Sequence, residues 1–197
     1  MLKSDRWIRE QAAQGMIEPF EPQLIRVAAD QGIARQTLSF GTSSYGYDLT
    51  LSPKEFKVFK HVPGTIMNPK QFNAANLEAA KLHLDSFGSF FILPGHSYGL
   101  GVAVEKLQMP ANITGICLGK STYARMGIIA NLTPVEAKWS GHLTLEFSNS
   151  SCADCRIYAN EGIVQVLFLE GEPCETTYED RKGKYQGQGE AVTMAIV

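Results

Sequence analysis

From Tyr45 to Pro173 the sequence is a succession of short apolar segments, and this pattern constrains the fold more than any other feature. Each segment is rich in β-branched or aromatic residues and ends near Gly, Pro or Asn, which is typical of strands joined by tight turns. The clearest segments are YGYDLTLS, EFKVFK, SFFILPG, SYGLGVAVEKLQMP, ITGICLG, HLTLEFSNS, CRIYANEG and IVQVLFLEGEP. So many short strands in 197 residues predict one mainly β domain, a sandwich or barrel, over residues 1–197.

Segments outside this pattern predict a few short helices and a C-terminal tail. Residues from about 4 to 14 have the pattern of a helix, with Ser4 at its start and Gly15 after its end. Residues 74–84 and 121–127 are compatible with helical turns or loops. From about residue 176 to residue 197 the chain is polar and Gly-rich, which predicts a flexible tail folded over a surface.

Composition and charge argue against several classes of partner. The net charge of −2 argues against a nucleic-acid partner or a polybasic membrane binder. No apolar run approaches the roughly 18 residues of a membrane span, and the start MLKSDRWIRE lacks the apolar core of a signal peptide. We therefore expect no membrane partner and a cytoplasmic location. The four cysteines then predict reduced thiols rather than a disulfide framework.

Two motifs suggest chemistry that their spacing does not support. The segment GICLGKS resembles a phosphate-binding P-loop but is one residue too short, and no long helix follows. Cys152 and Cys155 form a C-x-x-C pair near His142 and Glu146. The zinc deaminase signature needs H-x-E and P-C-x-x-C, whereas here His and Glu are four residues apart and the proline is absent. We therefore predict no zinc site and interpret the two cysteines as part of a turn.

The strand pattern of HLTLEFS singles out one acid. Alternation places Leu143, Leu145 and Phe147 on one face and Thr144 and Glu146 on the other. A carboxylate in the middle of a strand needs polar partners, solvent or a chemical role. The pattern alone leaves open whether the polar face is simply solvated.

A second polar group lies in GKSTYAR. Ser121 and Arg125 are four residues apart, so one helical turn places them on the same side. A hydroxyl, a guanidinium and free backbone N–H groups can bind an anion. The tail adds Tyr178, Lys184 and Gln188, which are either a solvated run or a cover for an anionic ligand.

Successive blocks of the chain closely resemble the bacterial dCTP deaminases. The blocks are SDRWIRE, GMIEPFEP, GTSSYGYDL, GKSTYAR, NLTPVEAKW, GHLTLEFSNS, IYANEGIVQVLF and GKYQGQ. They occur in the same order along nearly the whole chain, and the resemblance weakens only between about Pro63 and Leu93. The resemblance implies a distorted β-barrel or jelly-roll of the dUTPase-like type. It also implies a homotrimer with sites between subunits.

The resemblance also implies a role for individual residues. Glu146 matches the family's catalytic acid–base, and Ser121 and Arg125 match the polar residues that accompany it. The positions that match the family's nucleotide-binding residues are Lys120, Ser121, Thr122, Tyr123, Ala124, Arg125, Thr144, Leu145, Glu146, Gln165, Tyr178, Lys184 and Gln188.

The implied reaction is hydrolytic deamination of dCTP to dUTP and ammonia, without zinc, feeding dUMP and dTTP synthesis. One carboxylate can take a proton from the attacking water, deliver it to N3 of the base and later protonate the leaving amine. Mg²⁺ is expected to bind with the triphosphate. The resemblance also raises deoxythymidine triphosphate as a feedback inhibitor, which the sequence leaves open.

Several positions depart from the family pattern and keep alternatives open. Thr50 and Ala137 stand where relatives commonly carry arginine and proline, and these changes leave open a preference for a modified cytosine nucleotide. Glu136 occupies the place of the aspartate that activates water in dUTPases. A dUTPase or a bifunctional deaminase/dUTPase is therefore the nearest alternative, and a non-catalytic nucleotide sensor is an alternative of another class.

Overall fold

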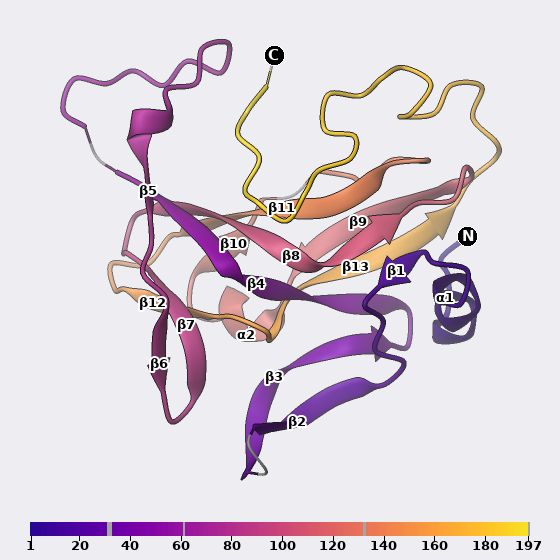
Figure 1. The fold of residues 1–197 in the computed structure, drawn as a ribbon, viewed down its shortest axis with the longest axis horizontal. Helices are drawn as coiled ribbons and strands as arrows, with labels where there is room; N and C mark the ends of the chain where they lie inside the picture. The colour runs from indigo at the N-terminus through magenta and orange to yellow at the C-terminus, as the bar shows by residue number, and fades with distance from the viewer. Residues whose placement is uncertain (31–32, 61, 132, 197) are drawn as a thin grey trace.

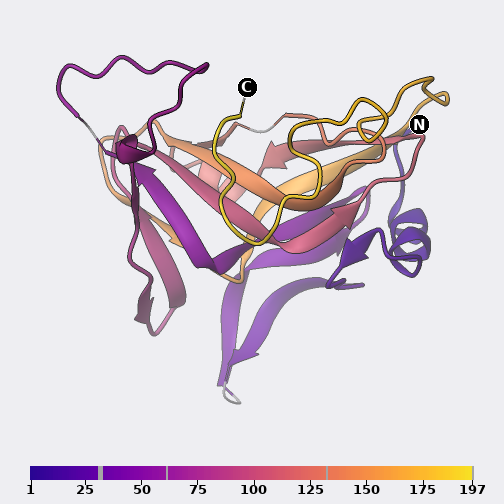
Figure 2. The same ribbon diagram turned by 45° about the horizontal axis from the view of Figure 1, so that its top comes forward.

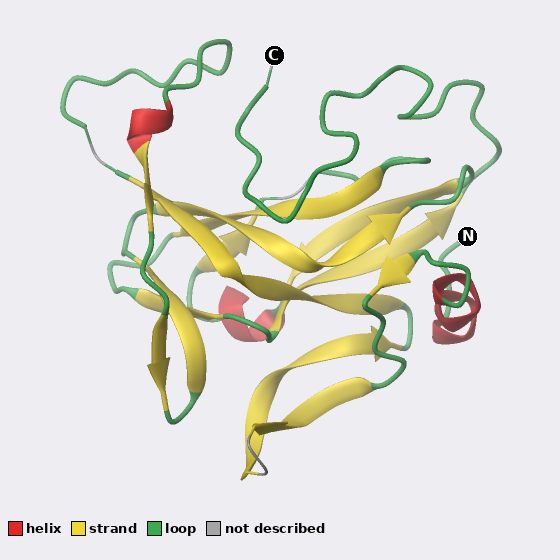
Figure 3. Cartoon of the chain, viewed as in Figure 1, coloured by secondary structure: helices red, strands yellow, loops and turns green. Residues whose placement is uncertain are grey.

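A computed structural model describes residues 1–30, 33–60, 62–131 and 133–196 (Figure 1). Strands are the commonest regular structure among these residues, and the helices are short (Figure 3). The described strands form two distorted sheets rather than one closed barrel. The predicted mainly β fold with a few short helices is therefore confirmed. No helix in the described ranges is long and apolar enough to cross a membrane.

The larger sheet contains ten strands, and its main path runs β10-β11-β8-β4-β13-β9. Long antiparallel strands with a fully buried face make this sheet the framework of the domain. The bounds on the main path are β10 Ile128–Ala130, β11 Ser140–Asn149, β8 Tyr98–Gln108, β4 Gly46–Phe59, β13 Gly162–Glu170 and β9 Ile113–Gly119. The strands attached to it are β1 Ile17–Glu18, β2 Leu24–Asp30, β3 Ile33–Ser43 and β5 Leu77–Ala79.

The smaller sheet and the helices lie around this framework. The three strands are β12 Cys155–Tyr158, β7 Gly88–Leu93 and β6 His83–Asp85. Helix α1 covers Asp5–Ala12, within the predicted range, although the Ser4 side chain makes no capping hydrogen bond. In the segment 74–84 only Ala74–Asn76 is helical, as a 3₁₀ turn. The segment 121–127 contains the one-turn helix α2, Ser121–Ala124.

The core is built from the inward-facing residues of the strands. Leu145 and Phe147 of β11 are fully buried, and the Phe147 ring stacks near Phe56 of β4 at a centroid distance of 6.2 Å. Phe56 also stacks on Phe91 of β7 at 5.2 Å, so the two sheets share one apolar core. A fully buried side chain of this size stabilises the fold by about 1.5–3 kcal/mol through the hydrophobic effect.

Glycines in β8 allow this packing. A Cβ atom at Gly99 would lie 2.7 Å from the Phe56 ring, and one at Gly101 would lie 2.5 Å from the Leu51 side chain. The small residues in YGLGVAVE therefore admit large side chains of β4 against β8.

The C-terminal tail lies along the outer side of the large sheet (Figure 2). The described residues 171–196 contain no helix or strand, and Val197 lies outside the described residues. The backbone N–H of His142 in β11 donates to the carbonyl of Gln188 at 2.9 Å. The N–H of Thr193 donates to Oγ1 of Thr144 at 3.1 Å. These bonds place the tail beside the polar face of β11.

Candidate active site

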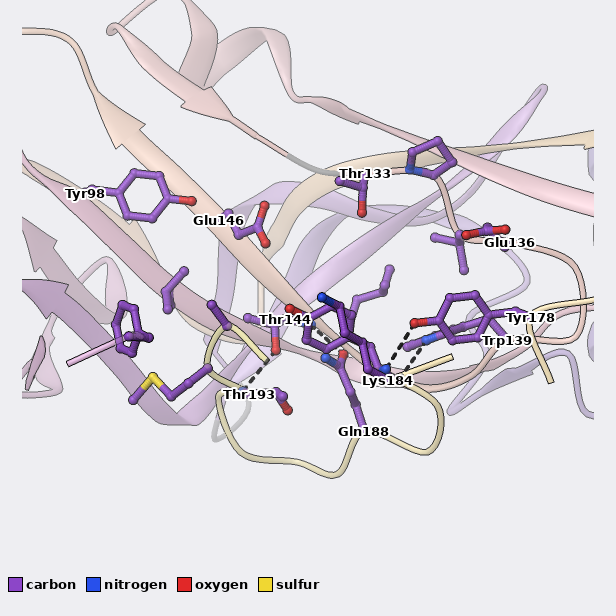
Figure 4. A pocket seen from close by; sticks show the side chains of 18 of the residues that line it. Tyr98, Thr133, Glu136, Trp139, Thr144, Glu146, Tyr178, Lys184, Gln188 and Thr193 are labelled. Atoms are coloured by element: carbon purple, nitrogen blue, oxygen red, sulfur yellow. Dashed lines mark hydrogen bonds between the residues drawn. The ribbon is translucent and has the colours of Figure 1, made fainter. Parts of the chain in front are cut away.

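A cavity of about 540 Å³ lies between β11, β8, the loop that follows β10, and the tail. This volume is typical of a small-molecule site. Figure 4 shows Glu146, Thr144 and Tyr98 from the strands, Thr133 and Glu136 from the loop, and Tyr178, Lys184 and Gln188 from the tail around the same space. Five of the residues expected to bind substrate therefore lie together: Thr144, Glu146, Tyr178, Lys184 and Gln188.

Glu146 is placed in the cavity by the alternation of β11. Its neighbours Leu145 and Phe147 point into the core, so the carboxyl group points the other way, where it lines the cavity. The side chain is partly buried, and this desolvation raises the pKa of the Glu146 carboxyl above its ordinary value. A carboxyl group of this kind can both accept and donate a proton closer to neutral pH than an exposed one.

Thr144 connects the tail to β11 where that strand lines the cavity. Its backbone N–H donates to Oε1 of Gln188 at 3.4 Å, and its hydroxyl accepts from the N–H of Thr193 at 3.1 Å. Gln188 also forms a parallel bridge with Gly141. The tail therefore brings its polar side chains to the same strand that carries Glu146.

Hydrogen bonds of aromatic residues hold another part of the tail, around Tyr178 and Tyr185, beside the cavity. The indole N–H of Trp139 donates to the carbonyl of Tyr185 at 2.9 Å, and the N–H of Tyr185 donates to the hydroxyl of Tyr178 at 3.0 Å. Lys184 is the one Lys or Arg among the described lining residues. Glu136, also in the lining, is paired with Arg181. One end of the cavity thus carries a cation and the strand carries an acid.

Some lining residues were not predicted. β11 has a register shift against β8 between His142 and Thr144, and Leu143 lines the cavity despite its place in the apolar alternation. Tyr98 and Phe59 line it from β8 and β4. The sequence contains no signal for the register that brings these residues to Glu146. Leu145, by contrast, is fully buried, and its side chain is not among those that line the cavity.

The other expected site residues lie elsewhere on the chain. The described lining of the cavity includes none of residues 120–125 and does not include Gln165. Lys120 pairs with the buried Asp48, and Nε2 of Gln165 donates to Oδ1 of Asp48 at 3.0 Å. Tyr123 is buried, and its hydroxyl accepts from the N–H of Tyr158 at 2.8 Å. The exposed members are Ser121, Thr122, Ala124 and Arg125.

Exposed apolar side chains lie on β9 and β10, the strands before and after α2, and directly after α2. Ile116 and Leu118 of β9 are 39% and 47% exposed, and Ile129 of β10 is 50% exposed. Met126, directly after α2, is 49% exposed. We call these four residues the β9–β10 apolar patch. Large exposed apolar side chains such as these are candidates for burial at an interface between proteins.

The cysteine pair shows no metal-site geometry in the described residues. Within those residues no three His, Cys, Asp or Glu side chains come close enough to hold a metal ion together. Cys155 is buried and Cys152 is exposed, and both are free thiols. The intervening turn is held by Asn149, whose Nδ2 donates to the carbonyl of Ala153 at 2.8 Å.

Known proteins resemble this chain over almost its whole length. A family model described as dCTP deaminase-like matches residues 2–171. A protein from Bordetella parapertussis named dCTP deaminase is 52% identical over 188 residues, covering 95% of this chain and 95% of that protein. Another dCTP deaminase, from Xylella fastidiosa (strain M12), is 50% identical over 191 residues, with 95% of both chains covered.

A solved structure supports the fold. The crystal structure of a 2'-deoxycytidine 5'-triphosphate deaminase from Agrobacterium tumefaciens matches with a TM-score of 0.53 and 16% identity. The match covers 91% of this chain and 51% of that chain, so this chain spans about half the length of the solved one. At this identity the likeness concerns the fold alone. The family match and the two relatives identical at half or more of the aligned positions carry the conclusion: this chain belongs to the dCTP deaminase-like family.

Proposed function

We infer that this chain catalyses the hydrolytic deamination of dCTP to dUTP and ammonia. The observation that carries the proposal is the partly desolvated carboxyl group of Glu146, which lines a cavity of nucleotide size. Relatives named dCTP deaminase, at 50–52% identity over 95% of the chain, support the same reaction.

In the proposed reaction Glu146 carries the protons. Its carboxylate takes a proton from water as the oxygen adds to C4 of cytosine, and the proton passes to N3 to give a tetrahedral intermediate. Glu146 then takes the proton of the C4 hydroxyl group and gives it to the amino group, which leaves as ammonia as the C4 carbonyl forms. Thr133 and Pro134 line the cavity with Glu146, and a backbone carbonyl of this loop is our candidate for positioning the water. The scheme uses no zinc ion, because Glu146 itself activates the water by taking its proton.

The tail residues and Mg²⁺ are proposed to bind the triphosphate. Lys184 is the single cation in the described lining, and Arg181 is already paired with Glu136. One lysine does not balance the several negative charges of a triphosphate. The residues present therefore fit a nucleotide that arrives with Mg²⁺, which neutralises the phosphates and typically needs few protein ligands. Tyr178 and Gln188 are placed to hold the nucleotide beside Lys184.

We further propose that the site is completed by a second copy of the chain in a homotrimer. Ser121 and Arg125 are exposed on α2 and at its end, outside the cavity lining, and the residues of the β9–β10 apolar patch lie on the strands before and after α2 and directly after its end. Docking of this patch on a neighbouring copy would bury apolar surface and bring the hydroxyl and the guanidinium to the neighbour's Glu146. Ser121 then orients the water, and Arg125 orients the carboxylate.

Glu146→Gln tests the assigned role. The amide cannot carry the protons, so we expect ammonia release from dCTP to fall by about three orders of magnitude or more while dCTP still binds. Glu10→Gln, on the exposed face of α1, is the matched control and should keep wild-type activity. A Glu146→Gln enzyme with wild-type turnover would remove the proposed role. Loss of activity in a chelator that Mg²⁺ does not repair but zinc does would instead establish a zinc enzyme.

Complementation tests the site between copies. Glu146→Gln and Ser121→Ala are each expected to be nearly inactive. When the two variants are unfolded, mixed in equal amounts and refolded together, about a quarter of the interfaces pair an intact Glu146 with an intact Ser121. Recovery of about that fraction of wild-type activity supports the proposal. A mixture no more active than its components places both residues in one copy or assigns Ser121 no role.

A second candidate activity rests on Glu136. This carboxylate lines the same cavity as Glu146, although it is paired with Arg181. A bifunctional enzyme would also hydrolyse the triphosphate, releasing dUMP and pyrophosphate from dCTP. Product analysis separates the two: dUTP and ammonia indicate the deaminase alone. Binding of dCTP without any product would indicate a nucleotide sensor.

Two further expectations concern the cellular setting. Deoxythymidine triphosphate shares the deoxyribose and the triphosphate of the substrate, so we expect it to compete for the tail residues and inhibit turnover. Inhibition measured at fixed dCTP tests this directly. A cytoplasmic location is also expected.

A further inference from the structure

Two aromatic side chains separate the proposed nucleotide cavity from a second cavity. The second cavity has a volume of about 640 Å³ and includes His96, Ser97 and Ser148 in its lining. Phe59 and Tyr98 are the described residues that line both cavities. Their rings meet edge to face, with centroids 5.2 Å apart and an interplanar angle of 72°. We call this pair the aromatic wall.

The register of β11 places the aromatic wall directly beyond Glu146. Ser148 stands opposite Tyr98 and Glu146 stands opposite Leu100, so Tyr98 is a diagonal neighbour of Glu146 on the same face. The tail binds at Thr144, on the other side of Glu146. The spacing from Thr144 to Ser148 is about 13 Å at the usual rise of a strand. Figure 4 shows the same order, with Tyr98 and Lys184 on opposite sides of Thr144.

Asn131 and Glu146 are the polar neighbours of the Tyr98 phenol. Nδ2 of Asn131 donates to Oγ of Ser148 at 2.7 Å, and the Asn131 backbone N–H donates to the Glu146 carbonyl at 2.9 Å. Burial, and next the charge of Glu146, raise the pKa of Tyr98 to about 12, while the Asn131 side chain lowers it slightly. Tyr98 is therefore a neutral phenol at neutral pH.

The chemistry of cytosine determines which part of the base meets this wall. The sugar is attached at N1, and C4 lies on the opposite side of the six-membered ring, flanked by N3 and C5. With the phosphates at Lys184 and C4 at Glu146, the ring edge that carries C4 and C5 points away from the tail. In the proposed reaction Glu146 also serves N3, so C5 is the flanking position that remains to meet the residue beyond Glu146, which is Tyr98.

We propose that Tyr98, backed by Phe59, is a specificity-determining residue that limits the size of substituents on C5 of the cytosine ring. The proposal rests on the proposed function, because it takes the base orientation from the reaction at Glu146. The aromatic wall accepts the hydrogen on C5 of dCTP and prevents a base with a larger group on C5 from placing its C4 at Glu146, although the second cavity lies directly behind the wall. Removal of the wall joins the two cavities and gives the substituent a place.

The test compares dCTP, 5-methyl-dCTP and 5-propynyl-dCTP as substrates. For each variant the measured quantity is kcat/KM of the modified nucleotide divided by kcat/KM of dCTP. Tyr98→Ala should raise this ratio about 10-fold or more over the wild type. Tyr98→Phe keeps the wall and should leave the ratio within about threefold. Tyr45→Ala, at an exposed tyrosine between β3 and β4, is the matched control.

If Tyr98→Ala does not fold, a second variant, Phe59→Ala, tests the same proposal. Phe59→Ala removes the other ring, so the ratio should rise in that variant as well. A ratio unchanged in the folded wall variants would overturn the proposal. An equal rise in Tyr98→Phe would also overturn it, because the hydroxyl rather than the ring would then set the limit.

Binding measurements separate this proposal from the proposed function. The dissociation constants of dCTP and 5-propynyl-dCTP are measured by calorimetry in the Glu146→Gln background, with and without Tyr98→Ala. One outcome is that the wild type releases no ammonia while Tyr98→Ala shifts the ratio of the two dissociation constants about 10-fold. That result would mean that the proposed deamination is wrong but that the aromatic wall still selects the ligand. If deamination occurs and neither ratio shifts, the wall proposal alone is wrong.

Discussion

Glu105 of β8 is a buried carboxyl group whose titration should control how stability changes with pH. It is 3% exposed, and no described Lys or Arg forms an ion pair with it. Its oxygens accept from the backbone N–H of Thr50 at 3.0 and 3.2 Å and from the Thr50 hydroxyl at 3.0 Å. Burial raises the pKa of Glu105 to about 7, and the bonds from Thr50 offset only part of that rise.

The magnitude follows from the difference between folded and unfolded pKa values. The ordinary value is 4.5, so the folded chain keeps a proton on Glu105 between that value and about 7, where the unfolded chain has released it. The free energy of unfolding therefore falls as pH rises through this window. At 1.36 kcal/mol per pKa unit the loss is about 3 kcal/mol, and it persists at higher pH.

Glu105→Gln removes the titration and should remove this loss. Urea unfolding, followed by tryptophan fluorescence at one fixed protein concentration, gives the free energy of unfolding between about pH 5 and about pH 8. The wild-type value should fall across this range by about 3 kcal/mol more than the Glu105→Gln value. Glu10→Gln, which changes an exposed carboxyl group on α1, should follow the wild-type curve.

Two results would refute this reasoning. A Glu105→Gln curve parallel to the wild-type curve would mean that Glu105 is not the group that titrates. Thr50→Val gives an independent check, because the Thr50 hydroxyl donates to the ionised form and its loss should steepen the wild-type decline by about 1 kcal/mol. A shallower decline in Thr50→Val would contradict the assigned hydrogen bond.

Two further predictions concern other charged groups. Asp48→Asn should lower the free energy of unfolding by about 3–5 kcal/mol, because it leaves the largely buried Lys120 without its ion-pair partner. Glu190→Gln, in the exposed pair with Lys54, should lower it by at most about 1 kcal/mol. If urea unfolding shows the same loss of unfolding free energy in the two variants, the Lys120–Asp48 pair is not a buried pair. For activity, the ionised Glu146 is the base and its pKa is raised, so kcat/KM for dCTP should fall with decreasing pH through a pKa above 4.5. A profile flat down to pH 4.5 would contradict this.

Local pattern was sufficient for the strands and for Glu146. Alternation in HLTLEFS places Leu145 and Phe147 inside and Glu146 outside, because successive side chains of a strand point to opposite faces. The same rule fails at Leu143, which lines the cavity beside a register shift. A register shift depends on how β11 pairs with β8, so the sequence of β11 alone does not predict it.

The residues brought to Glu146 from distant parts of the chain required the tertiary structure. Tyr98 reaches Glu146 through the pairing of β8 with β11, and Gln188 reaches Thr144 through the fold of the tail. The sequence treated Ser121, Arg125 and Glu146 as one group through family resemblance. The structure places Ser121 and Arg125 outside the described lining of the cavity.

The strand-rich fold, the acid on the polar face of β11 and the family can be predicted from the amino-acid sequence, because they depend on side-chain periodicity and on ordered motifs within segments. Three features required the folded chain: which polar residues share the cavity, that Tyr98 and Phe59 close its far end, and that Glu105 is buried beside Thr50. Strand register and desolvation arise from contacts between segments far apart in the chain. No local pattern encodes those contacts.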